Sequence, residues 1–163
     1  QLLDEETIAL LGQKGVWLSL QVLEPAPPSA PEFTRAKKQQ VVDGTDKAYT
    51  WARKHKVKLA WGTDMLFDPR QNAKQTAELL KLRQWFTPAE ILKMVTHDNA
   101  ELLALSGPRN PYPGRLGVVE AGALADLLLV DGDPIANIRL IEDPARNFVV
   151  IVKDGKIVKN TVR

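Results

Sequence analysis

The residues of this chain best suited to catalysis surround a single carboxylate. Residues 58–65 read KLAWGTDM, so a short apolar run ends in Gly-Thr-Asp and places Asp64 where a β-strand should stop. An aspartate at such a position can ligate a divalent metal ion or accept a proton from water. It can equally be a turn residue or a helix N-cap. Taken alone, the local sequence favours the turn role.

Few other side chains could complete a catalytic group with Asp64. The chain has two histidines and no cysteine, which excludes disulfides, thiolate metal sites and cysteine nucleophiles. His55 lies in Arg-Lys-His-Lys at the expected end of a helix, where cations complement the helix dipole, so we expect a solvated cap. A nucleic-acid patch there is a weaker alternative, because the run is short and lacks aromatic residues. His97 precedes an expected helix N-cap, which favours a structural or surface role over a ligand.

Other acidic residues have simpler interpretations than catalysis. Asp126 lies in an apolar run expected to be a strand, and a buried carboxylate is costly unless it is hydrogen-bonded. We therefore expect Asp126 to bond nearby backbone or a basic side chain. The segment 131–134, Asp-Gly-Asp-Pro, suggests a cation loop but lacks the further ligands of an EF-hand. Turn formation explains it better.

Composition indicates a globular protein with no marked preference for charged partners. The 163 residues are 44% apolar and 26% charged, which is typical of a folded rather than a disordered chain. The net charge is +2, so we expect neither nucleic acid nor an anionic membrane as a partner. No apolar run approaches the roughly 20 residues that span a bilayer. Composition does not determine the cellular compartment. The chain begins without Met or a signal peptide, and we expect an upstream segment.

The first two thirds of the chain alternate between helical and extended patterns. Strands are expected at 16–22, covered on both faces, and at 57–61, separated by a proline-rich loop at 24–31. Helices are expected from an Asp4 N-cap to Gly12 or Gly15, at 33–55, at 74–85, from the Thr87 capping box onward, and from an Asp98 N-cap to 107. This order predicts a parallel α/β sheet or barrel, with Asp64 at the carboxyl end of a strand.

The last third of the chain has a different sequence pattern, in which short apolar runs replace the helical periodicity. Apolar runs at 116–119, 125–130 and 148–152 read as strands. Asp154 and Gly155 predict a two-residue type I′ turn that returns the chain as a further strand at 156–158. We expect a small all-β unit of roughly 50 residues, which is marginally stable alone.

Several segments together resemble the C-terminal signature of the amidohydrolase superfamily. They are THDNAELLAL at 96–105, LGVVEAGALADLLLVDGDP at 116–134 and VKDGKIV at 152–158. The chain is most similar to the imidazolonepropionase-like and Xaa-Pro dipeptidase-like branch. The resemblance implies an α/β fold, in which residues 1–112 are the C-terminal part of a (β/α)8 barrel with its strands seven and eight. Residues 113–163 would then be part of a small β-sandwich.

The resemblance also implies a role for Asp64. It matches the family's strand-eight aspartate, a metal ligand that takes a proton from the attacking water, in a site with one or two divalent ions, most often zinc. Met65 and Leu66 would line the substrate pocket, although packing on the barrel rim is nearly as plausible. The family's other ligands lie on strands one to six, none of which is in this chain. Because catalytic zinc takes three protein ligands, we expect the chain alone to be inactive and metal-free.

These expectations define a function and an alternative. The first is a metal-dependent hydrolase of amide-like C–N bonds in a small-molecule substrate, such as a dipeptide or an N-acyl compound. The alternative is a non-catalytic fragment or scaffold module of the same fold. Two strands cannot close a barrel, so we expect this chain to pack against a missing N-terminal portion of the same protein or another copy in a homo-oligomer.

Overall fold

The structure is a computed structural model that describes residues 2–65, 69–72 and 74–162. The chain forms two compact units, Gln1–Asp64 and Met65–Arg163, which are considered separately below. The boundary expected between residues 112 and 113 would separate a barrel domain from a β-sandwich domain in the complete protein. It remains a prediction.

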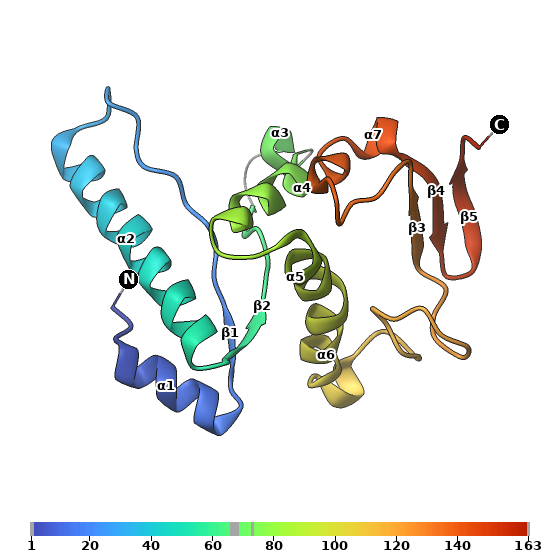
Figure 1. The fold of residues 1–163 in the computed structure, drawn as a ribbon, viewed down its shortest axis with the longest axis horizontal. Coiled ribbons are helices and arrows are strands. Elements are labelled where there is room, and N and C mark those ends of the chain that lie inside the picture. The colour runs from blue at the N-terminus through green and yellow to red at the C-terminus, as the bar shows by residue number, and fades with distance from the viewer. Residues whose placement is uncertain (1, 66–68, 73, 163) are drawn as a thin grey trace. The chain divides into compact units, whose positions relative to one another are not determined.

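The first unit is a β-α-β arrangement preceded by a helix (Figure 1). Its elements are α1 (Glu5–Lys14), β1 (Trp17–Ser19), α2 (Glu32–Lys54) and β2 (Lys58–Ala60). The Asp4 side chain accepts a hydrogen bond from the Thr7 backbone N–H at 2.8 Å, and Gly15 ends the helix with a φ of 65°. The N-cap and the terminating glycine therefore confirm the first expected helix.

The strands β1 and β2 pair in parallel, as expected, with Leu18 opposite Leu59. Both leucines pack on a cluster supplied largely by the two helices, with Ile8, Ala48, Ala52 and Val57 at its centre. β1 is shorter than the expected 16–22, because a strand needs a hydrogen-bonded neighbour and β2 pairs over only three residues.

Helix α2 confirms the amphipathic pattern expected at 33–55, and Gly44 does not interrupt it. Thr45, Ala48, Tyr49 and Ala52 are its buried residues, spaced by three, one and three positions. The buried Tyr49 hydroxyl donates to the Leu20 carbonyl oxygen at 3.0 Å, and burial raises the Tyr49 pKa above its ordinary value. Within the described ranges, no helix has the length and apolarity needed to span a membrane.

The second unit begins with short helical segments. They are α3 (Pro69–Asn72), α4 (Gln75–Glu78), the 3-10 helix η1 (Leu79–Gln84), α5 (Pro88–Lys93), the π-helix η2 (Met94–Asp98), α6 (Asn99–Ala104) and the 3-10 helix η3 (Gly107–Arg109). The helix expected at 74–85 is present, although half of it is 3-10. Thr87 and Glu90 form the expected capping box, with the Thr87 backbone N–H donating to Glu90 Oε2 at 2.7 Å.

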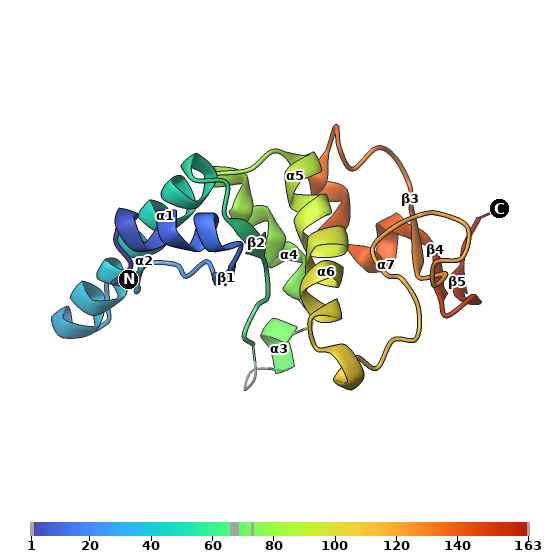
Figure 2. The same cartoon turned by 90° about the horizontal axis from the view of Figure 1, so that it is seen from below.

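The expected N-cap at Asp98 is wrong. Figures 1 and 2 show α5 and α6 as one helical column, and the π-helix η2 joins them. Asp98 has helical angles, φ −70° and ψ −39°, and its side chain makes no cap hydrogen bond. The carboxylate pairs with Lys93 instead, so an ion pair along the helix replaces the cap that the sequence suggested.

The second unit ends in an antiparallel sheet with the order β3 (Leu127–Val130), β4 (Phe148–Lys153) and β5 (Lys156–Asn160). The expected type I′ turn is confirmed, since Asp154 and Gly155 have φ values of 51° and 73°. The segment is not all-β as expected, because η4 (Ile138–Ile141) and α7 (Pro144–Asn147) lie between β3 and β4.

The strand expected at 116–119 is also wrong, because residues 116–119 form no strand. Gly117 has a φ of 71°, which is incompatible with an extended strand. A Cβ at this position would lie 2.6 Å from the Thr96 carbonyl oxygen. The chain therefore turns against the helical column here, and the close approach requires glycine.

Candidate functional site

Asp64 lies beyond the carboxyl end of β2, in the first unit. Because β1 and β2 are parallel, their carboxyl ends meet at one edge of the sheet, after Ser19 and Ala60. Asp64 follows Ala60 by four residues, in a segment without regular structure. The structure therefore places this carboxylate at the edge of a parallel α/β sheet where ligands usually bind.

The conformation of Asp64 combines features of a turn residue and of a free ligand. Its φ is 54°, a left-handed value that is uncommon outside glycine and is tolerated by aspartate. The side chain is exposed, and its carboxylate makes no hydrogen bond or ion pair with any residue that the structure describes. The turn is thus formed without the carboxylate, which is left available to bind something else.

The residues beside Asp64 refine the expected site. Met65 is half-buried, and Leu66, the other expected substrate contact, lies outside the described residues. Gly62 lies two positions before Asp64, after the end of β2. A Cβ added there would meet open space, and its φ lies outside the left-handed range, so the fold of this chain does not require glycine at that position.

The described residues near Asp64 do not form a complete metal centre. Among the described residues, one group of histidine and acidic side chains has the spacing for a metal ion, and it does not include Asp64. Catalytic zinc sites use three protein ligands. This chain therefore supplies a single candidate ligand at the sheet edge.

The group with metal-like spacing consists of His97, Asp98 and Glu101. His97 Nδ1 lies 3.0 Å from Asp98 Oδ1, and His97 Nε2 lies 4.0 Å from Glu101 Oε1. Lys93 Nζ already pairs with the same Asp98 oxygen, so a cation is part of the group. The arrangement is an ion-pair network along one helical column, which agrees with the structural role expected for His97. His97 and Glu101 are four positions apart, an ordinary helical spacing, and the group was missed from the sequence because a helix was expected to begin at Asp98 between them.

His55 is the C-cap of α2, as expected, but its side chain is partly buried and joins the two helices of the first unit. Its Nε2 lies 3.0 Å from Glu5 Oε1, and Lys54 Nζ lies 2.5 Å from the same oxygen. The His55 side chain is 27% exposed. Hydrogen bonds from Lys54 and then His55 hold the pKa of Glu5 below its ordinary value. The cap residue therefore also links α1 to the end of α2 through Glu5.

Asp126 has the bonding partners that its sequence context predicted. Its Oδ2 lies 2.5 Å from Lys153 Nζ, and its Oδ1 accepts a hydrogen bond from the Asp154 backbone N–H at 2.7 Å. The Lys153 bond, followed by the Asp154 bond, lowers the pKa of Asp126. Turn formation is likewise confirmed at Asp133, whose Oδ1 accepts from the Ile135 backbone N–H at 2.8 Å. Both carboxylates therefore have structural roles.

Comparison with known proteins relates the whole chain to one family. The Amidohydrolase family profile matches residues 1–159. Ochratoxinase from Aspergillus niger is 32% identical over 124 residues, which are 76% of this chain and 24% of that protein. Its crystal structure has a TM-score of 0.74 at 26% identity, covering 96% of this chain and 35% of that one.

A prolidase crystal structure, in complex with N-methylphosphonate-L-proline, shares the fold. Its TM-score is 0.78 at 24% identity, and the match covers 98% of this chain and 39% of that one. The chain spans about a quarter of the length of the curated relatives that it matches, and about two fifths of the solved structures. Its α/β fold thus corresponds to part of an amidohydrolase structure. The chain belongs to the Amidohydrolase family.

Proposed function

We propose that this chain is the C-terminal portion of a metal-dependent hydrolase that cleaves amide-like C–N bonds in a small molecule. The observation that carries the proposal is the Asp64 carboxylate, unpaired among the described residues, at the carboxyl edge of a parallel strand pair. The family match over residues 1–159 supports the reaction class. In such folds, the catalytic groups lie at the carboxyl ends of the strands.

The parallel pair of β1 and β2 would be the seventh and eighth strands of a (β/α)8 barrel. The order of the first unit supports this proposal, because helix α2 connects two neighbouring parallel strands, as in the repeating unit of such barrels. Residues 1–112 would then complete the barrel, and residues 113–163 would contribute to a small β-sandwich.

Asp64 would be one ligand of a metal site that holds one or two divalent ions, most often zinc. It would also accept a proton from the attacking water. A bound divalent ion lowers the pKa of water toward about 7. The other ligands would come from an N-terminal portion of the same protein. The open surroundings of the Asp64 carboxylate support this division, because no described side chain competes for it.

The substrate that we propose is a dipeptide or an N-acyl amino acid. The ochratoxinase and the prolidase that resemble this chain support this choice by name, and the prolidase structure contains a proline derivative. Met65 and Leu66, directly after Asp64, would contribute apolar contacts to the substrate pocket.

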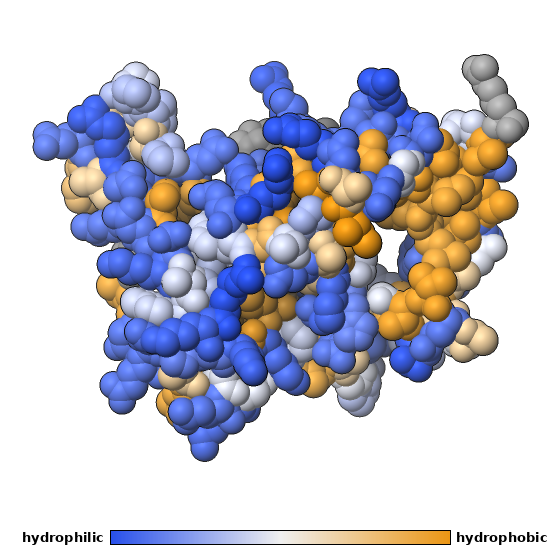
Figure 3. Space-filling view, viewed as in Figure 1, coloured by the Kyte–Doolittle hydropathy of each residue, from blue (hydrophilic) through white to orange (hydrophobic). Residues whose placement is uncertain are grey.

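The C-terminal sheet supports a covering partner, for which we propose the missing N-terminal portion of the same protein. Leu128 and Leu129 of β3 are 56% and 53% exposed, and Ile157 of β5 is 64% exposed. Successive strand residues point to opposite faces, so both faces of the sheet carry exposed apolar groups. Figure 3 shows apolar surface gathered over the sheet on the face in view. A second copy of the chain, as in a homo-oligomer, is the alternative cover.

A second candidate is a non-catalytic scaffold module of the same fold. The observation in its favour is that the described residues offer one candidate metal ligand at the sheet edge, whereas catalysis requires several. The two functions differ in what they expect upstream of residue 1. The hydrolase requires metal-binding histidines there, and the scaffold does not.

The test compares Asp64→Asn with the unchanged enzyme in the complete protein. We expect kcat/KM for an N-acyl-proline substrate with added zinc to fall by about 10²–10⁴-fold, because asparagine cannot accept the proton. Bound zinc, measured by atomic emission, should fall as well. The matched control is Asp131→Asn, an exposed aspartate in the second unit, which should keep full activity. An Asp64→Asn enzyme with full turnover would refute the proposed role of Asp64.

A further inference from the structure

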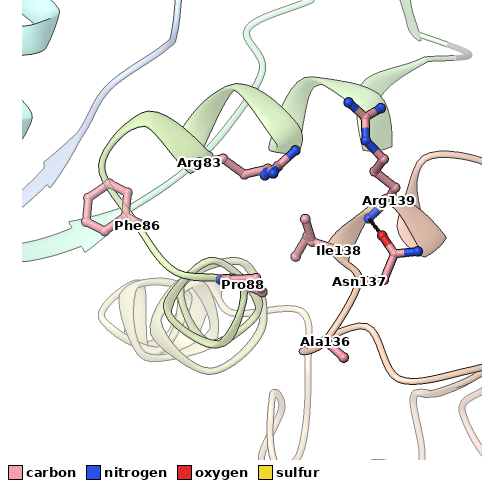
Figure 4. A pocket seen from close by; sticks show the side chains of 7 residues that line it. All are labelled: Arg83, Phe86, Pro88, Ala136, Asn137, Ile138 and Arg139. Carbon is pink, nitrogen blue, oxygen red and sulfur yellow. Dashed lines mark hydrogen bonds between the residues drawn. The ribbon is translucent and has the colours of Figure 1, made fainter.

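A separate pocket lies within the second unit and has no role in the proposed hydrolysis. Its volume is about 280 Å³, and it lies between the end of η1, the start of α5 and the segment that enters η4 (Figure 4). This volume is near the lower limit of ordinary ligand pockets, about 300 Å³. The pocket can therefore accept only a small ligand.

Two arginines make the pocket wall positive. Arg83 is exposed and makes no hydrogen bond or ion pair within the described part of the chain. Figure 4 shows its side chain extending from η1 toward Ile138. Arg139 forms a 3.3 Å ion pair with Glu142, and both side chains are exposed, so this pair is weak. No carboxylate belongs to the described pocket lining.

The floor of the pocket is apolar. Phe86 and Ile138 line it and are 8% and 3% exposed, and Pro88 lies beside them. The Oδ1 atom of Asn137 accepts a hydrogen bond from the Arg139 backbone N–H at 3.2 Å. The Asn137 amide nitrogen has no acceptor in the described part of the chain, so it is available as a donor. The pocket thus combines two guanidinium groups and one amide with a surface suited to a short hydrocarbon body.

We propose that this pocket binds a small organic anion, with a carboxylate or phosphate group attached to a short apolar body. Guanidinium groups bind such planar or tetrahedral anions through paired, charge-assisted hydrogen bonds. Arg83 and Arg139 would hold the anionic group, and Phe86, Pro88 and Ile138 would contact the body. The site uses none of the residues assigned to hydrolysis.

The test measures binding of benzoate, phenyl phosphate and inorganic phosphate to the complete protein by titration calorimetry at neutral pH. We expect saturable one-to-one binding of at least one aromatic anion, tighter than that of inorganic phosphate because only the aromatic probes reach the apolar floor. The stronger of benzoate and phenyl phosphate identifies the anionic group that the site prefers. Activity is not part of the readout, so the result is independent of the proposed hydrolysis.

Variants then assign the binding to this pocket. Arg83→Gln and Arg139→Gln should each weaken the aromatic anion by about fivefold or more, since each removes a charge-assisted bond. Arg109→Gln is the matched control, because Arg109 is an exposed arginine of the same unit that does not line the pocket. It should leave binding unchanged. Circular dichroism checks that all three variants fold. Absence of saturable binding, or equal weakening by the control, would overturn the proposal.

Discussion

At the scale of single residues, two aspartates that adjoin apolar strands differ in whether their carboxylates are bonded. Asp126 lies directly before β3 and bonds both Lys153 and the Asp154 backbone N–H. Asp64 follows β2 and has no partner among the described residues. The Asp126 carboxylate therefore stabilises the fold, whereas the Asp64 carboxylate is free to bind a ligand as far as the described residues show. Asp64 and Asp126 have similar sequence contexts, so the neighbouring groups in the folded chain decide which carboxylate has a structural role.

The bonds of Asp126 predict a dependence of stability on pH. Its pKa is lowered in the folded chain, so its contribution is complete above its ordinary value of 3.8 and is lost as the pH falls through the lower folded value. Asp126→Asn should therefore lower the thermal midpoint at pH 7, because the variant loses the charge that pairs with Lys153. The difference from the unchanged protein should shrink as the pH falls below 3.8 and through the lower folded pKa.

The measurement is thermal unfolding of both proteins at several pH values, with Asp131→Asn as the control. Asp131 is exposed, and no carboxylate bond is recorded for it among the described residues, so its variant should follow the unchanged protein throughout. A loss of stability by Asp126→Asn that is the same at pH 7 and at pH 2 would rule out the charge pair as its cause.

At the scale of elements, local signals placed helix ends and turns correctly when the partners are close in sequence. The Asp4 N-cap, the Thr87 capping box and the Asp154 turn all depend on residues within three positions. Asp98 resembles these caps in sequence, yet Lys93 and the π-helix make it part of a continuous column. Because the helix continues through Asp98, its carboxylate pairs with Lys93 and does not cap a helix.

Two glycines allow a prediction about the segment that crosses this helical column. Gly117 and Gly122 both have left-handed angles, with φ values of 71° and 87°, but only a Cβ at Gly117 would meet backbone atoms. Gly122→Ala should cost about 1–2 kcal/mol, the strain of a left-handed residue. Gly117→Ala should cost about 1–3 kcal/mol more, because its methyl group would collide with the Thr96 carbonyl oxygen.

Urea unfolding of the two variants in parallel gives this difference directly. Because Gly122→Ala carries the same conformational strain without the collision, it serves as the matched control for Gly117→Ala. Equal free energies of unfolding would mean that the segment at residue 117 does not pack against the helical column.

At the scale of the whole molecule, the C-terminal sheet leaves large apolar side chains exposed. Leu128 and Leu129 point to opposite faces of β3, and both are more than half exposed. Exposed apolar patches of this kind are typical of surfaces that another segment or subunit covers. The β1 and β2 pair likewise has only one parallel neighbour for each strand within the described residues.

The isolated 163-residue chain should therefore associate with itself or bind a hydrophobic dye such as ANS. Sedimentation velocity measures the association, and the double variant Leu128→Gln with Ile157→Gln should reduce both effects by removing exposed apolar area. In the complete protein, these residues should cause neither self-association nor dye binding, because they are covered. A dye-free monomer of the isolated chain would contradict both the need for a cover and the barrel proposal.

The sequence alone determined the order of helices and strands from α1 to β2, the caps at Asp4 and Thr87, the turn at Asp154, the family resemblance and the place of Asp64 after a strand. These follow from residues near one another in the chain, whose preferences do not need a partner. Tertiary structure alone decided the length of β1, the turn at Gly117, the tie between His55 and Glu5, and the two arginines at one pocket. Each depends on groups distant in sequence, and only packing determines which of them meet.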